Sequence, residues 1–305
     1  MQKIALIGEF LPMGEQMKRL KKLGVVSVCG NPKNKKQLIQ FAKDKNIIIT
    51  HCEFDKGVLS SLPNTKLIVS WTTGLDNIDV DYANQKGIMV VNTPDYCSQS
   101  VAEYAFALLF CVERKIVQSS REVEKNSWNC LPYIGRELAG KTIGIVGYGN
   151  VGKKVSKLAL GLEMKVLINT KNKEANTEKV NFVDLTALLK EADYVILCTS
   201  LNSSSENLIS IKQLSEMKPI TTLINTSRGK IIDENALAIT LKRNKQMFAA
   251  LDVLATEPKI NKKLLNLPNV LITPHNAWNT QEALIRGAKQ CVDHVELFMK
   301  NKGLK

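Results

Sequence analysis

Two series of short apolar runs, each alternating with helical stretches, constrain the fold of this chain more than any other feature. Such alternation is typical of parallel β-sheets whose strands are joined by crossover helices. The first series predicts strands at residues 3–7, 25–28, 46–50, 66–71 and 88–91. The second series predicts strands at residues 142–146, 165–169, 193–198, 221–225, 248–253 and 269–273. A chain of 305 residues has room for two domains, one for each series.

Two long helices are expected beside these strands. Residues 100–120 contain neither glycine nor proline and are apolar on more than one face, which predicts a largely buried helix that joins the domains. Residues 280–300 form a second helical pattern, with Thr280 as N-cap and Glu282 in the first turn. We expect this terminal helix to pack on the first domain, which would make that domain discontinuous.

Composition favours a globular, cytoplasmic protein. Apolar residues make up 44% and charged residues 23%, close to the averages for such proteins. No stretch approaches the ~18 consecutive apolar residues of a membrane-spanning helix, and the N-terminus lacks the apolar core of a signal peptide. The seven cysteines are odd in number and lack C-x-x-C spacing, so we expect reduced thiols and neither disulfides nor a metal site.

The net charge of +13 raises the question of nucleic-acid binding. The lysines, however, are spread in small groups, without a long basic tract and without interleaved aromatic residues. We therefore expect no nucleic-acid partner. The charge suits attraction of an anionic cofactor and an anionic substrate.

A glycine pattern, Gly147-x-Gly149-x-x-Gly152, follows the first strand of the second series and opens a helical stretch. In that context it predicts a dinucleotide-binding turn. Gly147 permits the tight turn, Gly149 lets the backbone approach a pyrophosphate, and Gly152 lets helix and strand pack closely. The phosphates would lie at the positive end of the helix. The expected cofactor-binding residues of the loop are Gly147, Tyr148, Gly149, Asn150, Val151 and Gly152.

Charged residues follow the later strands of the second series, at the edge where open α/β sheets bind ligands. Three of them suit the reduction of a 2-oxo acid by hydride transfer. Arg228 can hold a carboxylate with its planar fork. His275 can donate a proton to the carbonyl oxygen, and Glu257 can orient the imidazole and favour its charged form. The remaining histidines, His51 and His294, are not accompanied by such a set of charged residues, and we expect both to have structural roles.

Six segments of the chain together resemble the D-isomer-specific 2-hydroxyacid dehydrogenase family. In the family's order they are residues 73–79 (TGLDNID), 92–103, 140–152, 224–237, 250–258 and 273–280, and the match spans nearly the whole chain. The resemblance implies an α/β fold of two doubly wound parallel-sheet domains. Residues 99–281 would form a Rossmann cofactor domain, and residues 1–98 plus 282–305 a flavodoxin-like substrate domain. It also implies a homodimer.

The resemblance further implies a role for individual residues. Arg228 would bind the substrate carboxylate, and Glu257 would support His275 as proton donor. The backbone of Thr73 and Gly74 would also hold the carboxylate. The cofactor crevice would be completed by Thr199, Thr226 and Asp252, the last in contact with the nicotinamide carboxamide.

Two departures from the family pattern concern specificity. Members that use NAD usually end their second strand in an acidic residue, whereas Thr170 stands here, followed by Lys171 and Lys173. Thr170 can donate to a 2′-phosphate and the lysines can supply positive charge, so we expect NADP rather than NAD as the preferred cofactor. The second departure is Trp278, shortly after the predicted catalytic His275. A tryptophan here makes the chain resemble glyoxylate/hydroxypyruvate or glycerate reductases, and we expect Trp278 to contact the substrate.

The expected function is therefore hydride transfer between a nicotinamide cofactor and a small 2-oxo acid, with glyoxylate or hydroxypyruvate as substrate. Two alternatives remain open at this stage. One is a phosphoglycerate or D-lactate dehydrogenase of the same fold, and the other is a redox-sensing, NAD(H)-binding protein like the corepressor relatives of the family. Two domains around a crevice would also close on ligand binding, with hinges near residues 98–100 and 281–283.

Overall fold

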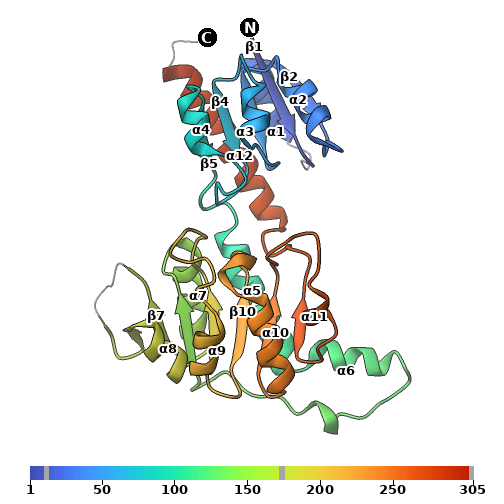
Figure 1. Cartoon of the computed structure of the whole chain (residues 1–305), viewed down its shortest axis with the longest axis vertical. Coiled ribbons are helices and arrows are strands. Elements are labelled where there is room, and N and C mark those ends of the chain that lie inside the picture. The colour runs from blue at the N-terminus through green and yellow to red at the C-terminus, as the bar shows by residue number, and fades with distance from the viewer. Residues whose placement is uncertain (10–13, 172–175, 302–305) are drawn as a thin grey trace. The chain divides into compact units, whose positions relative to one another are not determined.

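The computed structural model describes residues 1–9, 14–171 and 176–301. The chain divides into two compact units, Met1–Cys97 with Asn279–Lys305, and Ser98–Trp278. Each unit is built on a wholly parallel sheet with helices between the strands, so the expected α/β class is confirmed (Figure 1). Lys173, which the sequence places near the cofactor, lies outside the described residues.

The sheet of the first unit has five strands in the order β2-β1-β3-β4-β5. All five expected strands are present: β1 (Gln2–Ile7), β2 (Gly24–Cys29), β3 (Ile47–Thr50), β4 (Leu67–Ser70) and β5 (Met89–Asn92). The strands β3 and β4 are buried along their whole length, as apolar runs in a parallel sheet must be when helices cover both faces. The strand order reverses between β1 and β3, which is the flavodoxin-like arrangement.

The terminal helix α12 (Gln281–Asn301) belongs to this first unit. Its predicted N-cap is confirmed, since Thr280 Oγ1 accepts a hydrogen bond from the Ala283 amide at 3.2 Å. Arg19 of α1 (Gly14–Leu23) joins the two helices by ion pairs of 2.8 Å to Asp293 and 2.6 Å to Glu296. The unit also contains α2 (Lys35–Ala42), α3 (Lys56–Ser60) and α4 (Val80–Gln85).

The sheet of the second unit has seven strands in the order β12-β11-β10-β9-β6-β7-β8. They are β6 (Thr142–Val146), β7 (Lys165–Asn169), β8 (Val180–Phe182), β9 (Tyr194–Leu197), β10 (Thr222–Asn225), β11 (Phe248–Leu251) and β12 (Val270–Ile272). The expectation of six strands was wrong by one. It missed β8, which has only three residues and owes its conformation to pairing with β7. The order reverses between β6 and β9, where a Rossmann sheet binds its ligand.

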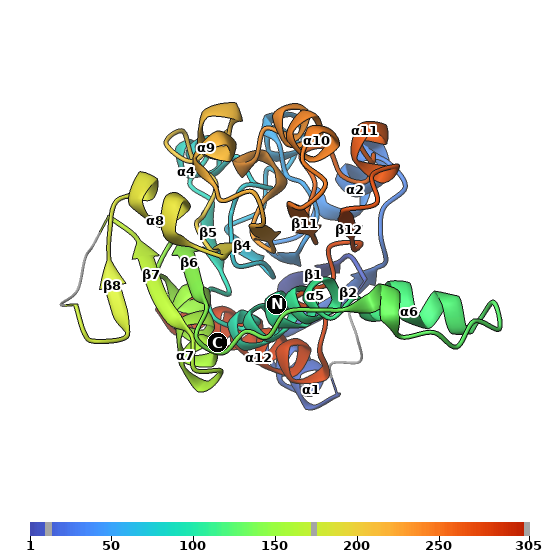
Figure 2. The same cartoon turned by 90° about the horizontal axis from the view of Figure 1, so that it is seen from below.

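Helices cover both faces of this sheet (Figure 2), and the buried apolar side chains form a separate core on each face. One face packs against α8 (Leu185–Glu191), α9 (Ile211–Glu216) and α10 (Glu234–Arg243). The other packs against α5 (Ser98–Glu113) and α7 (Asn150–Gly161). Neighbouring residues of one strand serve opposite cores, as Leu223 and Ile224 of β10 do. Among the described residues no helix is long and apolar enough to cross a membrane.

The single helix expected over residues 100–120 is in fact two. The first, α5, ends at Glu113, and Lys115 adopts a left-handed conformation (φ 51°) before α6 (Ile116–Val123) begins. The break has a tertiary cause. The chain returns at Arg136, whose amide donates to the Glu113 carbonyl at 3.2 Å while its guanidinium pairs with the buried Glu113 carboxylate at 2.7 Å. Unlike α5, α6 has no buried residue and projects from the rest of its unit (Figure 2).

Candidate active site

The glycine loop after β6 has the shape that a dinucleotide requires. Gly147 has φ +99°, and a Cβ there would lie 2.7 Å from the Thr199 amide nitrogen, so only glycine fits. A Cβ on Gly152 would lie 2.2 Å from the Gly147 carbonyl oxygen, which explains how α7 approaches the loop so closely. A Cβ on Gly149, by contrast, meets no atom within 4 Å. The loop is therefore closed toward the protein and open on the side where a pyrophosphate would lie.

The first turn of α7 strengthens this fit. Gly149 is its N-cap, and in the described parts of the chain no side chain caps the helix. Its first amide groups thus remain available to an anion. Beside the loop, Tyr148 packs edge-on against Phe182, with ring centroids 5.5 Å apart. Lys153 Nζ lies 5.4 Å from the centroid of the Tyr148 ring. These contacts hold the loop and place a positive charge beside it.

Thr226, which follows β10 at the same edge of the sheet, supplies a second indication of a ligand. Its side-chain oxygen is buried, yet it has no hydrogen-bond partner in the part of the chain that the structure describes. Buried hydroxyls are rarely left without a partner. The expected role of Thr226 in lining the cofactor crevice gives this hydroxyl a function, and together with the glycine loop it shows that the residues present fit a dinucleotide.

The end of β7 carries no carboxylate. Its last residue, Asn169, donates to the Val183 carbonyl at 3.1 Å, and the half-buried Thr170 follows. The next residue, Lys171, is exposed, and its Nζ lies 3.4 Å from Ser204 Oγ in the loop after β9. The acidic group that would favour NAD and repel a 2′-phosphate is therefore missing at this position.

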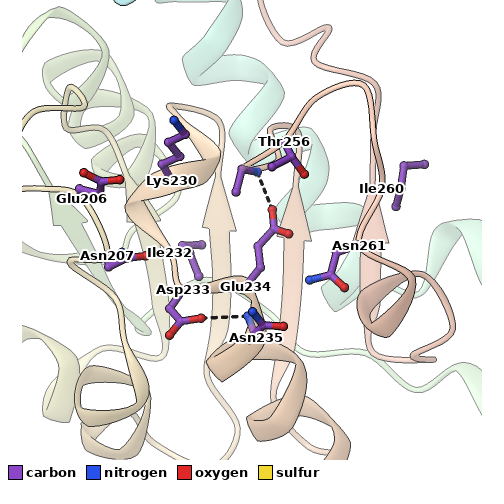
Figure 3. A pocket seen from close by; sticks show the side chains of 11 residues that line it. Glu206, Asn207, Lys230, Ile232, Asp233, Glu234, Asn235, Thr256, Ile260 and Asn261 are labelled. Atoms are coloured by element: carbon purple, nitrogen blue, oxygen red, sulfur yellow. Dashed lines mark hydrogen bonds between the residues drawn. The ribbon is translucent and has the colours of Figure 1, made fainter.

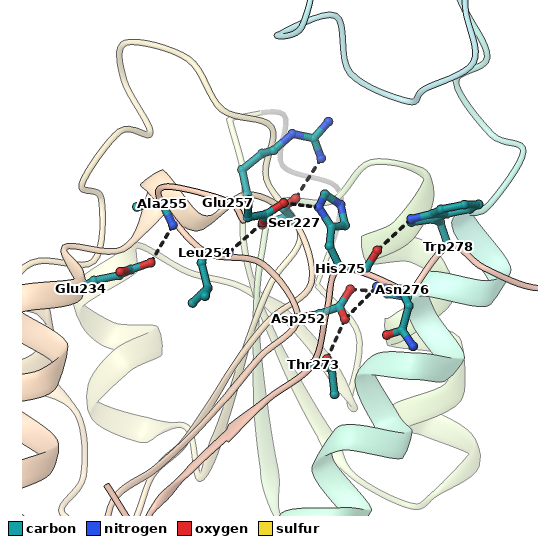
Figure 4. A network of polar contacts seen from close by, with 12 residues as sticks. Ser227, Glu234, Asp252, Leu254, Ala255, Glu257, Thr273, His275, Asn276 and Trp278 are labelled. Atoms are coloured by element: carbon teal, nitrogen blue, oxygen red, sulfur yellow. Dashed lines mark hydrogen bonds and ion pairs between the residues drawn. The ribbon is translucent and has the colours of Figure 1, made fainter. Parts of the chain in front are cut away.

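His275 and Glu257 are joined by a hydrogen bond at this edge of the sheet (Figure 4). Nδ1 of His275 lies 2.7 Å from Glu257 Oε2, and the other carboxylate oxygen accepts from the Leu254 amide at 2.8 Å. Burial acts to raise the pKa of Glu257. The hydrogen bonds from His275 and Leu254, helped by the positive charge of Arg228, outweigh burial and hold that pKa below its ordinary value. The carboxylate is therefore ionised and available to orient the imidazole.

Asp252 follows β11 directly and is almost fully buried, with 1% of its surface exposed. Its Oδ1 accepts from Thr273 Oγ1 at 2.6 Å and from the Asn276 amide at 3.0 Å. Its Oδ2 accepts from the Ala277 amide at 2.9 Å. Asp252 thus holds both sides of the turn in which His275 adopts a left-handed conformation (φ 52°), a conformation uncommon outside glycine.

This structural role of Asp252 was missed from the sequence. The available signal was a carboxylate at the end of an apolar strand, since a buried carboxylate requires several hydrogen-bond donors. Its contact with the nicotinamide carboxamide stays a prediction. Trp278 belongs to the same turn, because its Nε1 donates to the His275 carbonyl at 2.9 Å (Figure 4).

Arg228 lies in the turn between β10 and a short 3-10 helix, Gly229–Ile231. Its Nη1 donates to the Ser227 carbonyl at 2.9 Å, and its own carbonyl accepts from Asn225 Nδ2 at 2.9 Å. A Cβ on Gly229 would lie 1.9 Å from the carbonyl carbon of Leu254. The turn of Arg228 therefore packs directly on the loop that leads to Glu257, and the structure brings the three predicted catalytic residues to one edge of one unit.

Thr199 follows β9 in the second unit, whereas the predicted substrate-binding residues Thr73 and Gly74 lie in the first unit. Thr73 and Gly74 follow β4, where the Thr73 carbonyl accepts from Asn92 Nδ2 at 2.6 Å and the Gly74 carbonyl from Thr72 Oγ1 at 2.6 Å. His51 follows β3, and its Nε2 accepts from the Glu9 amide at 3.2 Å.

A pocket of about 390 Å³ lies beside the loop that leads to Glu257, and no sequence pattern pointed to it (Figure 3). It is lined on one side by Ala255 and Thr256, which precede Glu257, and on another by Lys230 and Glu234. Glu234 Oε1 accepts from the Ala255 amide at 2.6 Å. Glu234 thus supports the loop that leads to Glu257 from the start of α10.

Comparison with known proteins agrees with this geometry. Residues 106–277 match the family model of the D-isomer specific 2-hydroxyacid dehydrogenase, NAD binding domain. The chain is 36% identical to a glyoxylate reductase of Thermococcus litoralis, over 85% of this chain and 81% of that protein. It is 37% identical to a hydroxypyruvate reductase of Thermotoga maritima, over 81% of each.

Among solved structures, an acyclic imino acid reductase in complex with NADPH and D-Arg superposes with a TM-score of 0.90 at 34% identity, over 98% of both chains. The resemblance first seen in the sequence motifs is thereby confirmed. The chain belongs to the D-isomer specific 2-hydroxyacid dehydrogenase family and is an NAD(P)-dependent oxidoreductase of that family.

Proposed function

We propose that this protein reduces a small 2-oxo acid, glyoxylate or hydroxypyruvate, to the corresponding 2-hydroxy acid, which in the case of hydroxypyruvate is the D-isomer. The observation that carries the proposal is the 2.7 Å contact between His275 Nδ1 and Glu257, next to the turn of Arg228. A bound nicotinamide supplies the hydride. Because Nδ1 faces the carboxylate, Nε2 is the ring nitrogen that holds the proton for the carbonyl oxygen. Arg228 holds the substrate carboxylate as a bidentate partner.

The relatives support the proposed class of substrate. Those named glyoxylate reductase and hydroxypyruvate reductase favour small 2-oxo acids. We assign the cofactor to residues 99–281, and the substrate chiefly to residues 1–98 with 282–305, where the Thr73 and Gly74 backbone would hold the carboxylate.

The seven cysteines are all free, which supports a reducing, cytoplasmic setting.

The deciding experiment is a panel of initial rates. Glyoxylate, hydroxypyruvate, pyruvate and 3-phosphohydroxypyruvate would each be tested with NADPH and with NADH. Fastest reduction of glyoxylate or hydroxypyruvate supports the proposal. Preference for pyruvate or for the phosphorylated acid identifies a D-lactate or phosphoglycerate dehydrogenase, and cofactor binding without turnover of any 2-oxo acid, with ammonium or without it, identifies a redox-sensing protein.

A second candidate is reduction of an acyclic imino acid, and the similarity to a reductase of that class over 98% of the chain favours it. The same catalytic groups suit both reactions, because an imine, like a carbonyl, accepts a hydride at carbon and a proton at the heteroatom. The rate with each 2-oxo acid would be measured with and without ammonium, and products analysed by mass. A nitrogen-containing product formed faster than the hydroxy acid would make the imine the substrate.

NADPH is the cofactor that we expect this site to prefer. Thr170 and Lys171 occupy the position after β7 and offer a hydroxyl donor and a positive charge to a 2′-phosphate. Dissociation constants for NADPH and NADH, measured by fluorescence titration, test this directly. An NADH preference above about tenfold, roughly 1.4 kcal/mol, would refute it and leave the family assignment intact.

We further propose a homodimer in which residues 116–135, from α6 to the return of the chain, contact a second copy. This segment carries an unusual share of exposed apolar side chains, of which Trp128 is 92%, Leu131 73% and Ile134 76% exposed. Exposed apolar patches of this kind mark association surfaces. Trp128→Glu should lower the mass measured by analytical ultracentrifugation to that of a monomer, whereas Ile285→Glu, at an exposed apolar residue of α12, should not. A monomeric wild-type protein at micromolar concentration would contradict the proposal.

A further inference from the structure

The loops after β7 and β9 stand on either side of the glycine loop. In the sheet, β6 lies between β7 and β9, so the residues that follow all three strands share one edge. Lys171 follows β7 and Ser204 follows β9, and their side chains meet at 3.4 Å between Nζ and Oγ. Two loops that are 33 residues apart in sequence are thus joined beside the Gly147–Gly152 turn.

The loop that carries Ser204 is held by its own polar side chains. Ser205 Oγ donates to the Ser200 carbonyl at 2.7 Å and accepts from the Asn202 amide at 2.8 Å. Asn202 Oδ1 accepts from the Ser204 amide at 2.9 Å and from Ser204 Oγ at 2.7 Å. The second of these bonds uses the hydroxyl proton of Ser204. The oxygen lone pairs of Ser204 are therefore left for Lys171 to donate to.

We propose that Ser204 is a positioning residue for the cofactor's 2′-phosphate, acting through Lys171. An exposed lysine loses side-chain entropy when it binds an anion, and a partner that holds its ammonium beforehand reduces that loss. One N–H of the ammonium goes to Ser204 and two remain for the phosphate. The inference rests on the proposed NADPH preference and names the residue that completes its selectivity.

The test is direct binding of NADPH and NADH, followed by fluorescence and independent of turnover. Ser204→Ala should weaken NADPH binding about threefold to tenfold, the scale of an exposed hydrogen bond to a charged group, and leave NADH within about twofold. Ser204→Thr keeps the hydroxyl and should restore the NADPH affinity. Ser203→Ala is the matched control, since it removes an exposed hydroxyl from the same loop and should change neither affinity.

A double-mutant cycle identifies the route of the effect. In a Lys171→Met background, Ser204→Ala should cause no further loss of NADPH affinity, because the two residues act as one unit. If Ser204→Ala retains the wild-type ratio of NADPH to NADH affinity, or if the two losses simply add, the role of Ser204 is overturned while the NADPH preference stands. A wild-type protein without NADPH preference overturns both proposals.

Discussion

The two halves of the carboxyl edge of the seven-stranded sheet are built differently. After β11 and β12, the turn of His275, the proposed proton donor, is held by hydrogen bonds to the carboxylate of Asp252, which is 1% exposed. After β7 and β9, Lys171 and Ser204 are both exposed and share one contact of 3.4 Å.

The contrast has a physical consequence. Proton transfer requires atoms fixed to within a fraction of an ångström, and buried hydrogen bonds supply that precision. Selection between two cofactors requires only a favourable or an unfavourable charge, which an exposed lysine supplies and which salt can screen. Substitutions in the first half should therefore change the rate or the stability, and substitutions in the second half the choice of cofactor.

The largest effect is expected on the fixed half. His275→Asn removes the proposed proton donor and should lower the rate of 2-oxo acid reduction by at least ~10²-fold, the scale of general acid catalysis. NADPH affinity should be unchanged. His294→Asn, in α12 of the first unit, serves as the control with full activity. Near-wild-type turnover by His275→Asn would remove His275 from the mechanism.

Arg228→Lys keeps the charge but loses the planar fork that pairs with a carboxylate. The specificity constant kcat/KM should fall by roughly tenfold to a hundredfold for every 2-oxo acid, through both a higher KM and a slower kcat, because substrate orientation suffers. Steady-state kinetics over the same panel measures this. Unchanged constants in Arg228→Ala would mean that Arg228 plays no part in substrate binding.

Asp252→Asn compares the two halves in stability. The two oxygens of Asp252 accept hydrogen bonds from the backbone amides of Asn276 and Ala277. In asparagine one of these oxygens is replaced by an NH2 group, which cannot accept, so one buried backbone amide is left unpaired. The free energy of unfolding should fall by about 1–3 kcal/mol, measured by urea denaturation. Lys171→Met, on the exposed half, should change it by less than about 0.5 kcal/mol. Equal losses in the two variants would contradict the contrast.

Thr170→Asp places a carboxylate after β7. NADPH should bind about tenfold more weakly, and NADH should be affected far less, because the new charge repels the 2′-phosphate. The difference between the two cofactors should shrink at high salt. A difference that is absent at low salt would argue that Thr170 does not face the cofactor.

Glu257→Gln should have the smallest effect on the rate. The glutamine loses the negative charge but its amide oxygen still accepts a hydrogen bond from His275, so kcat for 2-oxo acid reduction should fall by less than about tenfold. An unchanged rate would speak against the pair.

The stability of the same variant tests the lowered pKa of Glu257. A carboxyl whose pKa is lowered on folding stabilises the folded state fully at pH values above its ordinary pKa of 4.5. This contribution is lost as the pH falls through the lowered pKa of the folded state. The difference in unfolding free energy between wild type and Glu257→Gln should therefore be present at neutral pH and disappear in acid.

Much of this protein follows from local patterns in the sequence. The strand runs of both sheets, the turn at Gly147–Gly152 and the placement of Arg228, Glu257 and His275 after strands all depend on residues close together in the chain. Apolar periodicity reports burial, and the rule that ligands lie at the carboxyl ends of strands places the charged residues at one edge. Local sequence is therefore sufficient to predict these features.

The tertiary structure decided what depends on distant partners. The strand β8 forms because β7 lies beside it, and α5 ends where it does because Glu113 meets Arg136 and also Thr222, which is 109 residues away. The hydrogen bonds of Asp252 and the contact between Lys171 and Ser204 likewise join separate loops. Such pairs cannot be predicted from a local pattern in the sequence. The conformation of each residue in them depends on a group that only the completed fold brings near it.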